Sequence, residues 1–559
     1  MVTETKGHIV LGILLGLSVC AWGQGGRAGR NAGQSTRQPA AEQQAPAAQQ
    51  QAPTAAGRGG GRGAAAAAGS SNELYNYDPN ASTSGFVDVP AVETHQKIAL
   101  NGETVAYTAR AGYMPLRNAT SGQTEAHMFF TSYSKDNGGI GRPMTFFMGG
   151  APGVSASWQE FGGLGPRRMK WAADGGAGMP PYGWADNPHT LLAATDLVFV
   201  NPVGTAFSRP ETPSHGPSFW NTTGDVASMG EFVRHFLAAQ NRRNSPVFLA
   251  GEDFGTSRAA GVAAYLAEHD VPVSGVILLS MSMSADATAG DAQYITLLPS
   301  LVMAAWHQKK VAPEFASMSA EQIAGRARQF ASREYLHALY KGDRMSAEER
   351  GKVAADLAGL TGLSKAFVVN NDLRISVERF NSELLRDRKL VLSSSDSRVT
   401  GYQPPASFGG RGRGGFGGFA AQPIDFNLSN LEGGFETAYD SYLQGELGFK
   451  GAGVFYLSSG GVGTYTATGS DEASLAGAFA RNPRLRLFVA MDYYDLAAPF
   501  YAAEFTMAHL NVSPQVRAHN ITVGHFESGQ MPYVDNKSLA KLGSDLAAFV
   551  KDATDGAGR

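Results

Sequence analysis

The chain has almost no cysteine and no excess of either charge. Its single cysteine, Cys20, lies in the first apolar segment, so the chain cannot form an internal disulfide. The 46 Lys and Arg residues nearly balance the 49 Asp and Glu residues, giving a formal net charge of −3, and no basic stripe recurs along the sequence. Because electrostatic capture of nucleic acid relies on such a stripe, we expect no nucleic-acid partner.

The apolar run at the N-terminus is short. It covers Ile9–Trp22 behind the basic Lys6, and a mature membrane-spanning helix needs a longer run. With the small residues Ala21 and Gly23 at its end, it is typical of a secretory signal peptide, residues 1–23. The sequence therefore predicts an exported protein, periplasmic or secreted, with no stable membrane span in its mature form. Two alternatives stay open, a buried N-terminal helix and lipid anchoring at Cys20.

Much of the excess of glycine and proline lies in two segments. Residues 24–72 consist almost only of Gln, Ala, Gly, Pro and Arg, and such a composition cannot bury enough apolar surface to order the chain. We interpret them as a disordered linker. The Gly-rich run Phe408–Phe419 carries only Arg411 and Arg413, so we interpret residues 405–422 as a surface loop rather than an RNA-binding segment.

The rest of the sequence alternates between strand and helix patterns. Segments of alternating hydrophobicity predict antiparallel strands at first, and later apolar runs before glycine turns predict buried strands. The predicted strands are His95–Leu100, Glu103–Ala109, His127–Tyr133, Met144–Met148, Asp196–Val200, Val247–Ala250, Gly275–Leu279, Leu485–Met491 and Gln515–Val523. The predicted helices are Asp225–Gln240, Thr256–His269, Ser319–Gly342, Ser346–Leu360, Ser364–Asn370, Ile375–Leu385 and Asn536–Lys551. Together these patterns predict an α/β fold with a doubly wound, mostly parallel sheet.

Helical patterns dominate between the predicted strands Gly275–Leu279 and Leu485–Met491. We expect residues 285–445 to form a mainly helical cap, inserted into a core made of residues 73–284 and 446–559. An insertion at this point lies over the carboxyl ends of parallel strands, where α/β sheets place their ligand sites.

The sharpest local motif is a strand followed by the turn Gly251-Glu-Asp-Phe-Gly255 and a helix of small residues. This is the form of a nucleophile elbow, a turn that holds its central side chain above the sheet in a strained conformation. The central residue here is Asp253 instead of serine. An aspartate can attack as a carboxylate, but the ester that it forms needs a base-activated water for hydrolysis.

The chain resembles the serine carboxypeptidases, exopeptidases with the α/β-hydrolase fold, and especially their bacterial members. The resemblance rests on separated segments that cover nearly all of the folded chain. They are Arg142–Ser155, Leu164–Arg168, Thr195–Ser208, the elbow, Asp372–Ser376, Asp396–Gly401, Tyr493–Pro499 and Gly529–Tyr533. It implies an α/β-hydrolase fold with a helical cap, and the ancestry of a serine-type peptide hydrolase.

Carried over by position, the resemblance puts the nucleophile at Asp253, the triad acid at Asp495 and the general base at Gln530. The triad needs an imidazole that takes up and returns a proton, and a glutamine amide cannot do this near neutral pH. Because an unpaired buried carboxylate is costly, we expect Asp495 to hydrogen-bond the Gln530 amide or nearby backbone N–H groups.

The predicted substrate-binding residues depart from the family pattern as well. In that pattern an Asn-Gly-Gly-Pro-Gly loop supplies an oxyanion-hole N–H and an Asn for the substrate carboxylate, whereas this loop begins Met148-Gly149-Gly150 and then inserts Ala151. Methionine cannot donate to a carboxylate, and the insertion should displace the glycine amide. Two further substrate-binding candidates flank Asp253 in the elbow, Glu252 and Phe254.

Other residues offer weaker alternatives. His525 precedes Gln530 by five residues and could replace the missing base, but a structural histidine is the default interpretation. His525 and Glu527 lack a third metal ligand at recognisable spacing, so we expect no metal and no cofactor. Ser257 lies on the helix after the elbow and is expected to pack or cap rather than attack.

The sequence thus favours an exported serine carboxypeptidase-like protein that has lost peptidase chemistry and binds a peptide C-terminus or another small ligand under the cap. The alternatives are a carboxypeptidase with an unrecognised arrangement and a hydrolase that uses Asp253 as its nucleophile. The sequence gives no oligomeric state.

Overall fold

The structure is a computed structural model that describes residues 89–555, except 101, 173–174, 282–284, 403–424, 452, 460–461 and 463–464. The chain divides into two compact units, Met1–Ser71 and Asn72–Arg559, and all described residues belong to the second. The predicted signal peptide, linker and Gly-rich surface loop lie outside the described residues.

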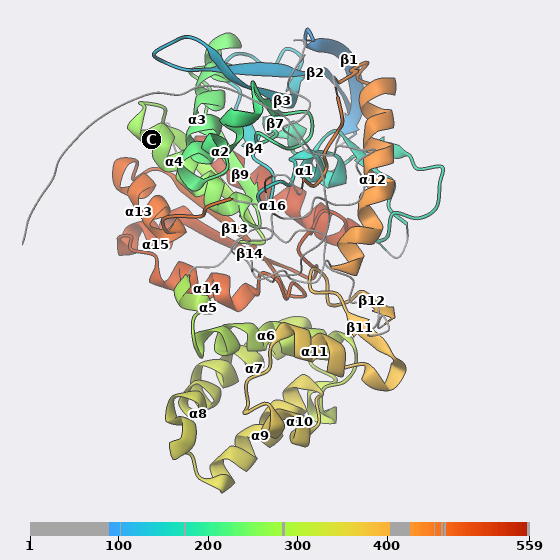
Figure 1. Cartoon of the computed structure of the whole chain (residues 1–559), viewed down its shortest axis with the longest axis vertical. Helices are drawn as coiled ribbons and strands as arrows, with labels where there is room; N and C mark the ends of the chain where they lie inside the picture. Colours follow the sequence, from blue (N-terminus) through green and yellow to red (C-terminus); the bar gives the residue numbers. More distant parts are fainter. Residues whose placement is uncertain are drawn as a thin grey trace, which may run out of the picture. The chain divides into compact units, whose positions relative to one another are not determined.

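A ten-stranded mixed sheet forms the centre of the second unit (Figure 1). Its order is β1-β2-β3-β7-β4-β9-β10-β13-β14, with β8 paired to β3. The strands are β1 (Val92–Leu100), β2 (Glu103–Arg117), β3 (Thr124–Lys135), β4 (Met144–Phe147), β7 (Asp196–Val200), β8 (Arg209–Pro210), β9 (Val247–Glu252), β10 (Val273–Leu279), β13 (Arg486–Asp492) and β14 (Ile521–Phe526). The first strands pair antiparallel, and all pairs from β7 to β14 are parallel. The predicted α/β fold with a mostly parallel sheet is confirmed.

Burial explains the two strand patterns. The edge strand β1 alternates between exposed and less exposed residues over most of its length, as expected for a strand with one solvated face. The parallel strands β4, β7 and β9 are buried at every residue, because helices cover both of their faces. Short apolar runs in the sequence therefore mark the central strands.

Helices cover both faces of the sheet (Figure 1). On one face α3 (Thr222–Ala239), α4 (Gly255–Glu268), α13 (Asp471–Arg481) and α14 (Phe500–His509) bury side chains against alternate residues of the strands, such as Phe146 and Leu249. On the other face α12 (Phe426–Gly445) and α16 (Asn536–Asp555) share a second core with Phe147 and Phe248.

A group of helices between β10 and β13 in sequence extends from one end of this body (Figure 1). It contains α5 (Ala285–Thr288), α6 (Ala292–His307), α7 (Ala320–Phe330), α8 (Leu336–Lys341), α9 (Ala347–Thr361), α10 (Lys365–Asn370) and α11 (Val377–Glu383), followed by the short pair β11 (Leu390–Leu392) and β12 (Thr400–Tyr402). Its apolar residues are continuous with the core on the α3–α4 face. We call α6–α11 the cap helices.

One predicted strand is partly wrong. Residues 515–520 belong to a helix, α15 (Pro514–Asn520), and β14 starts only at Ile521. The Ser513 hydroxyl accepts from the Val516 N–H and Pro514 occupies the first helical turn, so the local capping signal outweighs the apolar pattern.

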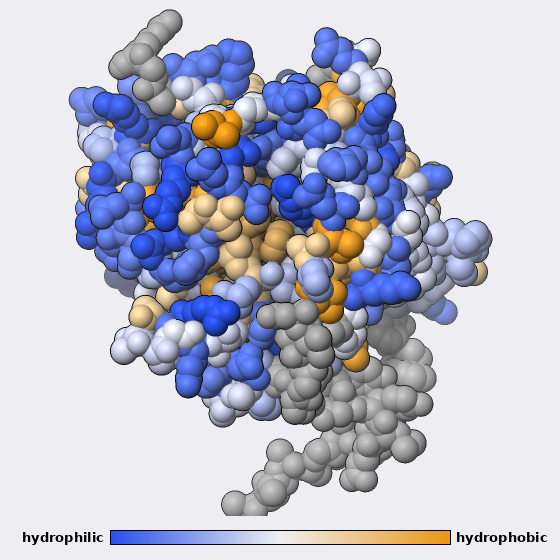
Figure 2. Space-filling model, turned by 90° about the horizontal axis from the view of Figure 1, so that it is seen from above, coloured by the Kyte–Doolittle hydropathy of each residue, from blue (hydrophilic) through white to orange (hydrophobic). Residues whose placement is uncertain are grey.

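The surface of the second unit is mostly polar. The face drawn in Figure 2 is largely hydrophilic, with hydrophobic residues gathered near its centre. Within the described part of the chain, no helix is both long and apolar enough to cross a membrane.

The turn after β9 depends on two glycines. A Cβ on Gly255 would collide with the carbonyl oxygen of Gly149, and a Cβ on Gly251 would collide with the carbonyl oxygen of Gly255. The strand, the turn and α4 can therefore meet the loop after β4 only while both positions lack side chains.

We predict that Gly255→Ala lowers the free energy of unfolding by about 2 kcal/mol or more, because backbone must move to make room for the methyl group. The matched control is Gly325→Ala on α7, where a Cβ would meet no atom within 4 Å. The control should be stabilised by roughly 0.5–1 kcal/mol. Urea unfolding of both variants checks this, and equal effects would contradict it.

Candidate active site and pocket

Asp253 occupies the tip of the turn between β9 and α4. Its φ of 51° is in the left-handed region, as a nucleophile elbow requires of its central residue. Its backbone N–H donates to the Leu279 carbonyl on the neighbouring strand at 3.0 Å. The carboxylate accepts from the backbone N–H of Phe254, the residue that follows it. The elbow geometry is present, and the aspartate itself uses an N–H of the turn.

Asp495 follows β13 and is fully buried. Its Oδ1 accepts from the backbone N–H groups of Ala497 and Ala498, both at 2.8 Å, while its Oδ2 has no hydrogen-bond partner. Of the two arrangements expected from the sequence, the backbone bonds are present and a bond from the Gln530 amide is not. One oxygen of the triad acid position is thus buried without a donor.

Gln530 lies in the loop after β14. Its backbone is fixed at both ends, because its N–H donates to the Ser395 carbonyl at 2.7 Å and its own carbonyl accepts from the Ser280 hydroxyl at 2.5 Å. Its side chain lines the same pocket as Asp253. The structure therefore brings the predicted nucleophile and base positions to one pocket.

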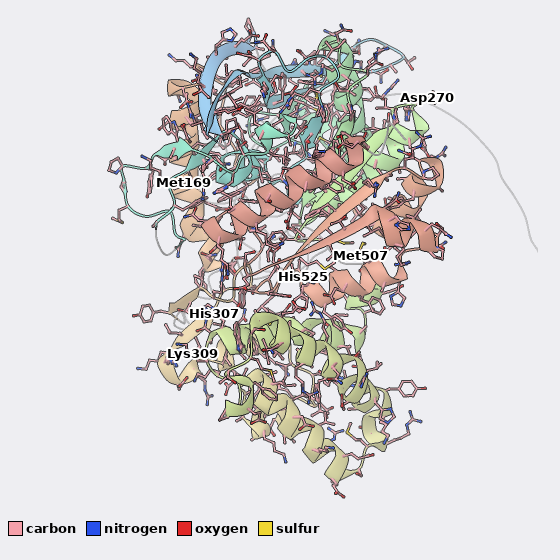
Figure 3. The ribbon with its side chains drawn as sticks, turned by 180° about the vertical axis from the view of Figure 1, so that it is seen from behind. Met169, Asp270, His307, Lys309, Met507 and His525 are labelled. Atoms are coloured by element: carbon pink, nitrogen blue, oxygen red, sulfur yellow. The ribbon has the colours of Figure 1, made fainter. Side chains whose placement is uncertain are left out.

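His525 makes its contacts elsewhere. Its Nε2 is 2.8 Å from Glu504 Oε1 and 3.1 Å from Arg328 Nη2, and its ring stacks on Tyr493. Figure 3 shows it between the sheet and the cap helices. None of its hydrogen bonds goes to Asp253 or to the buried acid after β13. His525 therefore ties the last strand to α7 and α14.

The two remaining alternative residues also have other partners. The Ser257 hydroxyl donates to Asp471 Oδ2 at 2.6 Å, which joins α4 to α13. Glu527 is exposed and contacts Lys537. Among the described residues, no three His, Cys, Asp or Glu side chains lie in a group that could hold a metal ion.

The loop after β4 departs from the predicted substrate site. The Met148 side chain is buried in the core on the α3–α4 face and does not line the pocket. The Gly149 N–H donates to Gln159 Oε1 at 3.1 Å, so this amide is already paired. Phe254 packs against Tyr465 in that core as well. Of the predicted substrate-binding set, Glu252 and Gly150 line the pocket.

A buried ion pair holds this loop against α4. Arg258 donates to the carbonyl oxygens of Met148 at 2.7 Å and Gly150 at 3.0 Å, and its Nε bonds both oxygens of Asp225. Both side chains are less than 5% exposed. Removing one partner would leave an uncompensated charge, so the pair fixes the loop beside the elbow. The sequence signal was a lone arginine within a helix of small residues.

The pocket has a volume of about 140 Å³. Three acids line it, Glu252, Asp253 and Glu432, and the described lining contains no lysine, arginine or histidine. The remaining lining residues are small, apolar or neutral and polar: Gly150, Ala151, Val154, Ser155, Trp158, Gln159, Leu428, Ser458, Gln530, Met531 and Tyr533. The sequence gave no indication of Gln159, Trp158 or Glu432, because helices far apart along the chain bring them here.

Buried acids gather around and beneath this pocket. Burial raises the pKa of Glu252 to about 8, against the opposing hydrogen bond from the Tyr533 hydroxyl, and that of Asp253 to about 6. Burial also raises the pKa of Asp492 to about 7, although the Ser280 and Ser528 hydroxyls donate to it. The pKa of Asp495 is raised well above its usual range, chiefly by burial. The site is therefore short of compensating positive charge.

Comparison with known proteins agrees with this architecture. The family model for serine carboxypeptidases matches residues 100–331, which include the elbow. A prohormone-processing carboxypeptidase from Saccharomyces cerevisiae shares the fold, with 14% identity and a TM-score of 0.50, over 80% of this chain and 91% of the yeast chain. The predicted resemblance to serine carboxypeptidases is confirmed, and so is the α/β-hydrolase fold.

Other solved structures are less similar. A thioesterase domain from the curacin biosynthetic pathway is 11% identical over 79% of this chain and 98% of its own, with a TM-score of 0.31. A lipase in its open form is 13% identical over 79% and 99%, also with a TM-score of 0.31. No curated protein sequence matches the chain significantly.

The raised pKa values predict how stability changes with pH. A carboxyl whose pKa is higher in the folded chain than in the unfolded chain is protonated on folding, so its contribution is present at low pH and lost as the pH rises. For Glu252, Asp253 and Asp492 this loss spans the range from about pH 4 to about pH 8. We expect the melting temperature to fall steadily across that range.

Asp495→Asn isolates one of these groups. The amide oxygen can keep both backbone bonds and the amide NH₂ replaces the unpartnered oxygen, so the variant should melt close to the wild type at pH 4.5 and higher than it at pH 8. The exposed Asp343→Asn serves as the control and should follow the wild type at both values. A variant that is less stable at pH 8 would contradict the assignment.

Proposed function

We propose that this serine carboxypeptidase-like chain is an exported protein without peptidase activity that binds a ligand in the pocket between Asp253 and Gln530. The observation that carries the proposal is the state of the three triad positions. A carboxylate sits on the elbow, an amide occupies the base position, and the acid at position 495 has a buried oxygen with no donor. In a working triad the imidazole of the base supplies that donor.

The oxyanion side supports the same proposal. The Phe254 N–H is bonded by the Asp253 carboxylate, and the Gly149 N–H is bonded by Gln159. A tetrahedral oxygen would thus compete with existing acceptors, one of which is negatively charged. Loss of a single oxyanion donor costs about 2.7–4 kcal/mol of transition-state stabilisation.

The export route is part of the proposal. It rests on residues 1–23, whose basic start, short apolar run and small-residue ending have the form of a signal peptide. The Gln, Ala, Gly, Pro and Arg composition of residues 24–72 would then place a linker between the cleavage site and the second compact unit.

Purified protein should release no C-terminal amino acid from blocked dipeptides between pH 4 and 8, because no group at position 530 cycles a proton. Chromatography of the released amino acid checks this over long incubations. A serine-directed phosphonate should likewise leave the protein at its unmodified mass. Turnover that Asp253→Ala abolishes would contradict the proposal and favour an aspartate nucleophile.

A repair series tests which defects matter. Asp253→Ser and Gln530→His should each be inactive alone, since a hydroxyl without a base and a base without a hydroxyl achieve nothing. The double variant also frees the Phe254 N–H and should be barely active. Deletion of Ala151 from the double variant should then raise kcat/KM by about 100-fold, if it returns the Gly150 amide to the oxyanion position. Met148 is left unchanged, because an asparagine there would bury an amide in the core. No further gain on deletion would mean that the loop is not defective.

A further inference from the structure

The lining of the pocket indicates what kind of ligand fits it. We propose that the pocket binds a primary ammonium group with a neighbouring carbonyl oxygen, as found at the N-terminus of a peptide or in an amino-acid amide. This deepens the proposed function and rests on it, because the ligand must survive in the site unchanged.

Charge is the first argument. Glu252 and Asp253 are adjacent in the chain and both reach the pocket, and Glu432 of α12 lies on its wall. The Tyr533 hydroxyl is the hydrogen-bond donor to Glu252, and the Ser458 hydroxyl is the donor to Glu432, so neither acid has a cationic partner here. An anionic ligand would add a further negative charge, whereas a cation would compensate those present.

A buried, unpartnered amide is the second argument and is independent of the acids. Gln159 is 1% exposed and lines the pocket. Its Oε1 accepts from the Gly149 N–H, which fixes the amide orientation, and its Nε2 has no partner. A buried amide NH₂ without an acceptor costs free energy, so the structure is complete only when an acceptor oxygen sits in front of it. The ligand therefore needs an oxygen acceptor as well as a cation.

The apolar part of the lining is compatible with this ligand. Trp158 stacks on Phe435 at a centroid distance of 4.2 Å and, with Val154, Leu428 and Met531, forms the apolar wall. An aromatic and aliphatic wall suits an apolar side chain next to the charged group, and aromatic rings also attract ammonium groups. The volume of about 140 Å³ is below that of a pocket for a drug-sized molecule, so it takes one end of a ligand.

Four matched probes separate these features. L-Leucinamide has the ammonium, the carbonyl and an apolar side chain. N-Acetyl-L-leucinamide lacks the ammonium, 3-methylbutylamine lacks the carbonyl, and N-acetyl-L-leucine presents only a carboxylate. At pH 7.0 the ammonium groups of the first and third probes are mostly charged. Asp253, with a pKa of about 6, is then mostly ionised.

Titration calorimetry on the full chain should give the tightest binding for L-leucinamide. We expect the other three probes to bind about tenfold more weakly or worse, since each lacks a charge-assisted or amide hydrogen bond. Asp253→Asn and Glu432→Gln should each weaken L-leucinamide by several-fold to tenfold, and the exposed control Asp343→Asn should not change it. Gln159→Met should abolish the preference for L-leucinamide over 3-methylbutylamine.

Two outcomes would overturn the inference. Tighter binding of N-acetyl-L-leucine would mean that the pocket still takes a C-terminal carboxylate, and L-leucinamide binding that ignores Asp253→Asn would place the ammonium elsewhere. Mass spectrometry of the recovered probes keeps the two proposals apart. Hydrolysis of L-leucinamide would refute the proposed loss of catalysis, whereas intact but unbound L-leucinamide would refute only the ligand assignment.

Discussion

The close contact between the turn after β9 and the loop after β4 is the constraint on which the site depends. Gly255 packs against the Gly149 carbonyl with no room for a Cβ, and Arg258 of α4 bonds the carbonyl oxygens of Met148 and Gly150 from the other side. The buried Asp225 compensates the charge of that arginine. Because this contact is made by backbone and by a buried ion pair, it can persist when the residue at the tip of the turn changes from serine to Asp253.

The same contact explains why the loss of triad residues leaves a defined pocket instead of a collapsed one. The carboxyl ends of β4, β9, β13 and β14 still bring their loops together, as parallel strands in an open α/β sheet do. What has changed is the charge. A triad in this place would have an imidazole next to the acid, whereas here the buried carboxyl groups of Glu252, Asp253, Asp492 and Asp495 repel one another and lie in an apolar environment. Their raised pKa values express that shortage of cations.

His525 illustrates how a plausible alternative is decided by packing. In the sequence it is the histidine nearest to Gln530, but in the fold it pairs with Glu504 and Arg328 and stacks on Tyr493. These contacts connect β14 to α14 and to the cap helix α7. Its role is thus to join the last strand to the helices beside it, and the region around it is stabilised by charge pairs that the pocket lacks.

The sequence by itself determined most of the sheet and the place of the site. Apolar runs fixed the buried parallel strands, because only a strand covered on both faces is apolar at successive residues. The glycine spacing of the elbow fixed Asp253 at its tip, because a positive φ and close backbone approach leave few other residues possible. The main local error was the start of β14, where Ser513 and Pro514 begin a helix within an apolar pattern. Only the tertiary structure decided the composition of the pocket. Gln159, Glu432 and Gln530 come from segments that are more than a hundred residues or several elements apart, and no local pattern encodes that they meet. The same holds for Met148, which its loop position assigned to the substrate and which packing placed in the core, since the direction of a side chain at the end of a strand depends on what covers each face.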